Sequence, residues 1–407
     1  MNDILIIGGG AAGLAAAISA ADADPSASIL ILEGLDRVGK KLLATGNGKC
    51  NLSNRHMGPE HYHTAAPERL ERWLEDMPTR ETLDFFRALG LACMEDEAGR
   101  IYPYARQASM VVDTLLLALH RRPNIRIRCG CRVTGLARSK GRFTVTAGEE
   151  THLARQVILT TGGRAAPRQG SDGSGYALAS ALGHSCTPLA PALVPLRCRG
   201  SWFKTLKGLR VLAAASLYRG RQLLGREEGE VQFTDYGISG IPTFQLSCLL
   251  TAENDIVLDL VPEQGFEALR SDFRRRAKEH PDECAEEALL GLLPKRLQFV
   301  LLREAGIDPA QRAGSLTRQQ LDELAGKYKR WRFPVTGTQG YENAQVTLGG
   351  IALDEVEQDF SSRRAPGLYL AGEVLDVTGD CGGYNLHWAW CSGRAAGSAA
   401  VRDRRQR

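Results

Sequence analysis

The fold is decided by the segment ILIIGGGAAG, which spans residues 4–13. Its apolar, β-branched start predicts a buried strand over residues 3–7 that ends in three glycines. An alanine-rich helix is predicted over residues 11–21, and a second buried strand over residues 28–32. The first 33 residues are therefore expected to form one βαβ unit.

This segment contains the dinucleotide-binding pattern G-x-G-x-x-G, with Gly8, Gly10 and Gly13 at the glycine positions. We expect Gly8 to allow the tight turn, Gly10 to let a pyrophosphate approach the backbone, and Gly13 to let helix and strand pack closely. The anion would lie at the helix N-terminus, where free N–H groups and the helix dipole favour it. Glu33 ends the second strand, where an acid accepts hydrogen bonds from an adenosine ribose and repels a 2′-phosphate. The pattern predicts a dinucleotide but does not separate NAD from FAD.

Two further segments favour FAD. The turn TTGG at residues 160–163 follows a predicted strand, as where a flavoprotein chain passes its adenine dinucleotide a second time, although an ordinary β-turn explains it equally well. The segment LYLAGE at residues 368–373 reads as a strand ending in Gly-Glu, and GGYN at residues 382–385 precedes a helix. This arrangement predicts that Glu373 binds the ribityl hydroxyls. The helix N-terminus would point at the pyrimidine edge of the isoalloxazine, where negative charge develops on reduction.

The length of 407 residues exceeds the ~250–300 residues at which one core usually stops growing, so several domains are expected. We expect an α/β fold with a two-part Rossmann-like FAD-binding domain, whose parts are residues 1–188 and 346–407. A β-rich, barrel-like domain is inserted at residues 189–262 with return strands at 329–345, and a small helical domain covers residues 263–328. Both ends of the chain are expected to share one sheet.

Composition excludes several classes of protein. Hydrophobic residues make up 43% and charged residues 24%, as in an ordinary globular protein. The formal net charge of +4 is small for a dedicated nucleic-acid surface. Ten cysteines without a regular framework favour a reducing cytoplasm. The apolar start lacks a basic n-region and no uninterrupted apolar run of about 20 residues occurs, so neither a signal peptide nor a membrane span is expected.

The order of these segments resembles the BaiN/RdsA (YhiN-like) family of NAD(P)/FAD-dependent oxidoreductases, which also contains an aminoacetone oxidase. The resemblance is carried by IIGGGAAG at residues 6–13, GKKLLATGNGKCN at 39–51, VTLGG at 346–350, and most specifically by AGEVLDVTG at 371–379 with GGYNL at 382–386. It covers nearly the whole chain, although the middle region matches only in its general pattern of strands and helices and not in motifs. One departure is the loop at residues 45–49, where many relatives have more glycines and an arginine before the cysteine.

The resemblance implies a non-covalent FAD site built from both ends of the chain. One of Lys40, Lys41 and Lys49 is expected to contact phosphate, and a solvated loop accounts for the other two. The expected cofactor-binding residues are Gly8, Gly10, Ala11, Ala12, Gly13, Glu33, Gly34, Lys40, Lys41, Asn47, Cys50, Asn51, Val133, Thr161, Gly162, Gly163, Gly350, Gly372, Glu373, Gly382, Gly383, Tyr384 and Asn385.

Three residues are candidates for catalysis: Tyr384 and His387 as proton donors, and Cys50 beside the flavin ring. Each also has a structural interpretation. No second cysteine lies near Cys50 in the sequence, and a single histidine is more often a hydrogen-bonded structural residue. His61 and His63 together with Glu60 resemble a set of metal ligands. A polar solvated loop is the favoured interpretation because no further ligand cluster supports a metal, so none is expected.

The function predicted from these features is hydride transfer at FAD to or from a small organic substrate. The chain has no second G-x-G-x-x-G pattern, so NAD(P)H would act as a transient reductant in the flavin cleft. A flavin amine oxidase that uses oxygen is an alternative. An RNA-modifying or RNA-binding flavoprotein is an alternative of another class, suggested by arginine-rich helices, although the small net charge argues against a nucleic-acid partner.

Overall fold

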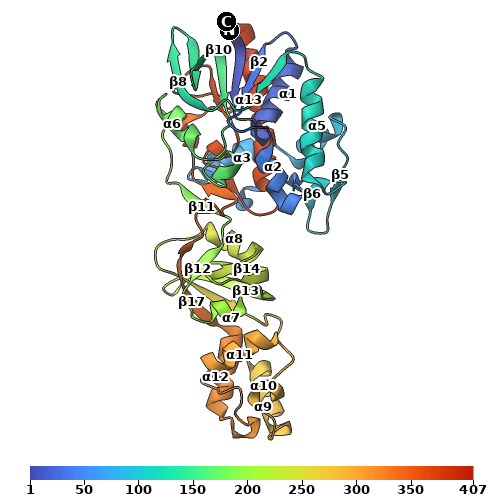
Figure 1. The fold of residues 1–407 in the computed structure, drawn as a ribbon, viewed down its shortest axis with the longest axis vertical. Coiled ribbons are helices and arrows are strands. Elements are labelled where there is room, and N and C mark those ends of the chain that lie inside the picture. Colours follow the sequence, from blue (N-terminus) through green and yellow to red (C-terminus); the bar gives the residue numbers. More distant parts are fainter. Residues whose placement is uncertain (407) are drawn as a thin grey trace. The chain divides into compact units, whose positions relative to one another are not determined.

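The chain forms two units, each with its own hydrophobic core, in a computed structural model that describes residues 1–406 (Figure 1). The first unit contains Met1–Ala192 and the chain from Tyr341 onward, and the second contains Leu193–Gly340. The sequence ends in a basic segment, residues 402–407, whose last residue, Arg407, lies outside the described residues. The second unit is therefore inserted into the first in sequence.

The first unit is built on a seven-stranded sheet in which both ends of the chain take part. Its strand order is β7 (Ile125–Arg128), β2 (Ile29–Leu32), β1 (Asn2–Ile7), β10 (Glu150–Leu159), β9 (Arg142–Ala147) and β8 (Val133–Ser139), and β19 (Leu368–Leu370) also pairs with β10. The strands β7, β2, β1, β10 and β19 run parallel. The central strands are continuous apolar runs because helices cover both faces of a parallel sheet. The predicted two-part Rossmann-like fold is confirmed.

Helices α1 (Ala11–Ala23) and α13 (Tyr384–Gln406) pack along a seam of small residues. A Cβ added to Gly393 would lie 2.3 Å from the carbonyl oxygen of Ala12. A Cβ added to Gly397 would lie 2.2 Å from the carbonyl oxygen of Ala16. Glycines four residues apart thus let the two backbones approach closely.

Smaller elements surround this sheet. Three small sheets are β3–β6–β5, β20–β4 and β11–β18. The helices are α2 (Lys40–Ala44), α3 (Pro67–Glu75), α4 (Thr79–Ala88), α5 (Ala108–His120) and α6 (Ser174–Ser180). The strands are β3 (Ser53–Asn54), β4 (Tyr62–His63), β5 (Cys93–Glu95), β6 (Arg100–Pro103), β11 (Ala190–Ala192), β18 (Val346–Leu348) and β20 (Thr378–Gly379).

The second unit contains a closed six-stranded barrel and a group of helices. The barrel order is β12 (Leu196–Cys198), β15 (Gly237–Ser239), β14 (Gln222–Phe233), β13 (Arg210–Arg219), β16 (Asn254–Asp259) and β17 (Trp331–Thr338). The helices are α7 (Phe203–Leu206), α8 (Ile241–Ser247), α9 (Phe266–Glu279), α10 (Ala285–Ala288), α11 (Lys295–Glu304) and α12 (Arg318–Lys329). The helices α9 to α12 are inserted between β16 and β17, and they share one hydrophobic cluster with the barrel. Within residues 1–406, no helix has the length and apolar character needed to cross a membrane.

Candidate functional site

The three motif glycines differ in what surrounds them. Gly8 has φ +104°, and a Cβ added there would lie 2.5 Å from the carbonyl oxygen of Thr160. A Cβ added to Gly13 would lie 2.0 Å from the carbonyl oxygen of Gly8, so these two glycines allow close backbone packing. Gly10 is the N-cap of α1, has no side-chain cap, and has open space around its Cβ position. The first turn of α1, which contains Ala11 and the buried Ala12, therefore has its approach open at Gly10.

Glu33, directly after β2, holds the glycine turn in place. Its Oε2 accepts a hydrogen bond of 2.7 Å from the backbone N–H of Gly9, and its Oε1 accepts one of 2.8 Å from Leu35 N–H. Each carboxylate oxygen keeps a further lone pair for hydroxyl donors. Gly34 follows at the surface, and Val133 begins β8 as a buried residue beside Arg132, whose Cα lies 3.7 Å from the Cβ position of Gly34.

The chain passes the glycine turn again after β10. Thr160 Oγ1 donates to the carbonyl oxygens of Ile7 and Gly8 at 3.0 and 2.9 Å, although it has one hydrogen to share between them. Gly162 has φ +72°, and a Cβ at Gly163 would lie 2.9 Å from Glu373 Oε1. Thr161 Oγ1 is buried without a hydrogen-bond partner among the described residues. This turn therefore joins the Gly8 loop to Glu373.

Glu373 connects four segments that are far apart in sequence. Its Oε2 lies 2.8 Å from Lys41 Nζ, and its Oε1 accepts a hydrogen bond of 3.0 Å from Thr347 N–H. Lys41 also donates to the carbonyl oxygen of Ala165 at 3.2 Å. The side chains of Lys41 and Glu373 are 25% and 18% exposed, so the pair is partly open to a ligand. Of the other lysines in this region, Lys40 pairs with Asp36 at 3.4 Å.

The other residues expected near the cofactor differ in their surroundings. Asn47 and Lys49 are exposed, and Asn47 has φ 54° in a short helical turn. Gly350 packs against backbone, because its Cβ would lie 2.5 Å from the carbonyl carbon of Leu375. Gly372 has φ +79°, and its Cβ would lie 2.8 Å from the Cβ of Ala12, so it fits against α1.

The N-terminus of α13 follows two glycines whose backbone conformation disfavours any other residue. Gly382 and Gly383 have φ +139° and +103°, and a Cβ at Gly383 would lie 2.4 Å from the carbonyl oxygen of Ser53 and 2.7 Å from Asn51 Oδ1. Asn51 Oδ1 is buried and has no hydrogen-bond partner within residues 1–406. The Asn385 side chain is used internally, because Oδ1 accepts from Gly379 N–H at 2.8 Å and Nδ2 donates to the Gly379 carbonyl at 2.6 Å.

All three catalytic candidates are buried, Cys50 and His387 completely and Tyr384 to 5% exposure. Burial raises the pKa of the Cys50 thiol to about 12, so it is protonated and inert near neutral pH. His387 is fully buried, and burial lowers its pKa to about 4. Its Nε2 donates to the Met77 carbonyl at 2.8 Å, and its Nδ1 lies 2.9 Å from Ser53 Oγ. This geometry favours a structural role for both residues.

A titratable cluster beside α13 was missed by the sequence interpretation. His61 and His63 belong to the chain around β4, and both rings contact the carboxylate of Asp380. They are 31% and 24% exposed, so the solvated loop that the sequence favoured is replaced by a partly buried cluster. The Tyr384 ring stacks on His61 with ring centroids 4.4 Å apart. The signal in the sequence was the spacing of two histidines, but Asp380 is distant and gave no indication of the pairing.

The arrangement fits an elongated dinucleotide. Gly10 leaves space at a helix N-terminus, and Glu33 and Glu373 offer carboxylate oxygens to hydroxyl donors. The buried oxygens of Thr161 and Asn51 have no hydrogen-bond partner among the described residues. These features match pyrophosphate, ribose and ribityl groups in turn. No group of three or more His, Cys, Asp and Glu residues suited to a metal ion occurs within residues 1–406.

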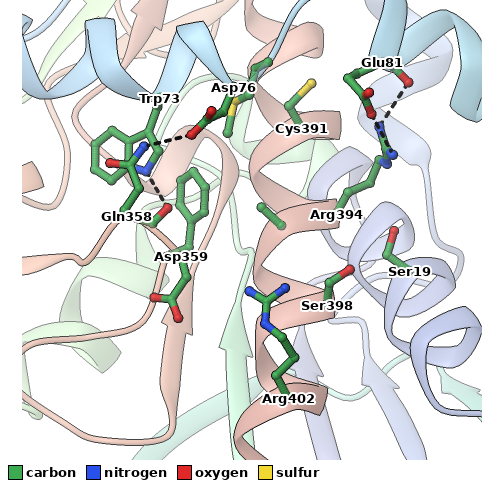
Figure 2. A pocket seen from close by; sticks show the side chains of 13 residues that line it. Ser19, Trp73, Asp76, Glu81, Gln358, Asp359, Cys391, Arg394, Ser398 and Arg402 are labelled. Atoms are coloured by element: carbon green, nitrogen blue, oxygen red, sulfur yellow. Dashed lines mark hydrogen bonds and ion pairs between the residues drawn. The ribbon is translucent and has the colours of Figure 1, made fainter.

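A separate hollow of about 410 Å³ lies beside α13, and Figure 2 shows its lining. Glu81 and Arg394 form an ion pair of 3.3 Å within this lining. Trp73 Nε1 donates to the Gln358 carbonyl at 2.8 Å. None of the expected cofactor-binding residues lines this hollow, so it is distinct from the site described above.

Comparison with known proteins gives four findings. The family model described as "HI0933-like protein Rossmann domain" matches residues 2–399. The chain is 42% identical to the 3-dehydro-bile acid delta(4,6)-reductase of Clostridium scindens, covering 98% of this chain and 99% of the relative. It is 29% identical to the ribosomal RNA dihydrouridine synthase of Escherichia coli, covering 96% of each chain. Among solved structures, 3-ketosteroid delta1-dehydrogenase from Sterolibacterium denitrificans has a TM-score of 0.52 at 13% identity, covers 99% of each chain, and shows a shared fold.

Proposed function

Because this chain belongs to the HI0933-like Rossmann family and is an FAD-dependent oxidoreductase, we propose that it reduces a carbon–carbon double bond conjugated with a carbonyl group in a small molecule. The observation that carries the proposal is the 42% identity, over nearly the full length of both chains, to a reductase of an unsaturated bile acid. Hydride addition to such a double bond is reaction chemistry that a reduced flavin supplies.

We assign the cofactor to residues of the first unit. The open N-terminus of α1 at Gly10 would hold the pyrophosphate, and Glu33 would accept hydrogen bonds from the adenosine ribose. Glu373 would exchange part of its contact with Lys41 for ribityl hydroxyls. The N-terminus of α13 would face the pyrimidine edge of the ring, where its N–H groups stabilise negative charge. FAD supplies the hydride when bound, and these residues bind and orient it.

The names of both relatives describe the same bond change. A delta(4,6)-reductase saturates carbon–carbon double bonds, and a dihydrouridine synthase saturates the double bond of a uracil ring beside a carbonyl. The reaction class is therefore better supported than any particular substrate. Since no second G-x-G-x-x-G occurs in the sequence, we propose that NADH or NADPH reduces the flavin transiently.

The test is an anaerobic experiment in two halves. The purified yellow protein is mixed with NADH or NADPH while flavin absorbance is followed, and the reduced protein is then mixed with a 3-oxo-4,6-diene steroid. We expect bleaching in the first half, and in the second half reoxidation of the flavin together with a product that has gained two hydrogens. A reduced flavin that transfers hydride to no conjugated enone would overturn the small-molecule proposal.

Ribosomal RNA uridine is the second candidate substrate. It is favoured by the similarity to the dihydrouridine synthase, which extends over 96% of this chain, and it runs against the expectation that nucleic acid is not a partner. The same reduced enzyme is incubated with ribosomal RNA, and nucleosides are analysed by mass spectrometry. Dihydrouridine formation without enone reduction would make RNA the substrate. Hydrogen peroxide formation with a small amine would instead favour the oxidase alternative.

A further inference from the structure

We propose that His61 is the catalytic residue that donates the proton in this reduction and that Asp380 is its positioning residue, an inference that rests on the proposed function. The carboxylate of Asp380 lies between two imidazoles, with Oδ2 at 3.3 Å from His61 Nδ1 and Oδ1 at 3.0 Å from His63 Nε2. The backbone N–H of Asp380 also donates to the His61 carbonyl at 2.9 Å. The pair of His61 and Asp380, called the dyad below, is thus held by backbone as well as side-chain hydrogen bonds.

Two short strands fix this geometry. β4 pairs antiparallel with β20, placing His63 opposite Thr378 and Tyr62 opposite Gly379. The Asn385 side chain bonds both polar groups of the Gly379 backbone, and its Nδ2 reaches the Asp380 carbonyl at 3.3 Å. The dyad and the first turn of α13 are therefore one connected block.

The tautomer of His61 follows from its partner. An ionised carboxylate only accepts hydrogen bonds, so His61 Nδ1 carries a hydrogen directed at Asp380. The other ring nitrogen, Nε2, is then the atom available to a substrate. It lies 3.9 Å from Glu60 Oε1, beyond hydrogen-bond distance, and the His61 side chain is 31% exposed. A carboxylate behind an imidazole with its outer nitrogen accessible is the arrangement of an oriented general acid.

Its position relative to the proposed cofactor site supports this role. The Tyr384 ring stacks on His61 at 4.4 Å with 21° between the planes, and Tyr384 is the first residue of α13. One side chain therefore separates His61 from the helix N-terminus assigned to the pyrimidine edge. Burial raises the pKa of Tyr384 to about 12, which makes its phenol a weaker acid than usual. His387 and Cys50 are fully buried, so His61 is the better placed donor of these groups.

The proposed step balances. Bound FAD, once reduced, would supply a hydride with its two electrons, and the carbon of the double bond farther from the carbonyl would accept it. The π-electron pair moves toward the carbonyl oxygen, and the carbon next to the carbonyl takes a proton from Nε2 of the His61 imidazolium. The product has gained two hydrogens, the flavin is oxidised, and the imidazole regains a proton from water.

The test separates the two half-reactions in the FAD-loaded protein. We expect His61→Gln to keep its FAD content and its rate of anaerobic flavin reduction, while reoxidation by the substrate that the wild type reduces falls about 100- to 10,000-fold. In His61→Gly, added imidazole should restore part of that rate. His120→Gln, at the exposed end of α5, is the matched control and should behave as wild type. Reoxidation at the wild-type rate in His61→Gln overturns the inference while leaving the proposed function intact.

A readout independent of turnover is nitrogen NMR of the histidine rings. When the imidazole of His61 is uncharged in the wild-type protein, we expect it to be the Nδ1–H tautomer. Asp380→Asn should shift the population of this tautomer, whereas Asp380→Glu should retain it. An Nε2–H tautomer in wild type would overturn the dyad, even where a variant does not fold. A wild-type protein that reduces neither enone nor uridine overturns the proposed function, and the inference with it.

Discussion

At the level of single residues, the three motif glycines have different reasons to be glycine. Gly8 and Gly13 are fixed by backbone contacts within the fold, whereas Gly10 meets nothing and has φ −83°, which alanine also adopts. The sequence pattern predicted these separate roles, because each position of G-x-G-x-x-G has its own geometric function. Only the structure shows that a methyl group at Gly10 is compatible with the protein without cofactor.

We therefore predict that Gly10→Ala folds normally but binds FAD about 5- to 150-fold more weakly. The added methyl group would hold the pyrophosphate away from the N–H groups of α1, and losing such a contact costs about 1–3 kcal/mol. FAD titration measures the affinity, and urea unfolding of the apo-protein measures stability. Gly13→Ala is the contrasting variant, and it should lose stability because its Cβ would lie 2.0 Å from the Gly8 carbonyl oxygen. Unchanged FAD affinity in Gly10→Ala would remove Gly10 from the site.

His387 makes stability depend on pH. Burial lowers its pKa from 6.5 to about 4, so the unfolded chain takes up a proton at a higher pH than the folded protein does. The contribution of uncharged His387 to the free energy of unfolding is complete above pH 6.5. It is lost as the pH falls toward 4, by about 3 kcal/mol in total. We predict that urea unfolding of His387→Gln depends less on pH over this window by about that amount, while exposed His120→Gln keeps the wild-type dependence. Equal slopes in all three proteins would contradict this.

At the level of elements, the seam between α1 and α13 depends on glycines that no other residue replaces. We predict that Gly397→Ala destabilises the first unit by about 1–3 kcal/mol, because its Cβ would overlap the Ala16 carbonyl oxygen. Gly326→Ala, in the middle of α12, has open space around its Cβ and should stabilise the protein by about 0.5–1 kcal/mol. Both changes are the same glycine-to-alanine substitution within a helix. Thermal unfolding measures both, and an unchanged or raised stability of Gly397→Ala would refute the seam.

Element prediction from sequence succeeded where apolar runs are strong. β1, β2 and residues 156–159 of β10 are buried and were expected, as was α13. Within the insert, which was predicted only as β-rich, Glu227 and Glu228 of β14 have low β propensity, and the pairing of this strand with β13 compensates for it. The dyad was missed. β4 and β20 are two-residue strands far apart in sequence, so the spacing of the two histidines gave no indication that Asp380 lies beside them.

At the level of the whole molecule, all the residues assigned to the cofactor lie in the first unit, while the second unit has its own core of barrel and helices. The chain leaves and re-enters the first unit at neighbouring points, since Ala192 pairs with Val346 between β11 and β18. The sequence indicated an insertion because residues 189–345 lack the α/β pattern of the two ends of the chain. It could not show how short a bridge between the ends would need to be.

We predict that replacing residues 193–340 with a short Gly–Ser linker leaves a protein that folds and binds FAD. The excised segment, expressed alone, should unfold cooperatively because its aromatic core, which includes Trp331 and Phe333, is complete within it, and it should bind no FAD. Flavin absorbance after desalting and circular dichroism during urea unfolding measure the two outcomes. A folded excision variant that binds no FAD would mean that the second unit contributes cofactor contacts, because Gly10, Glu33 and Glu373 would all still be present.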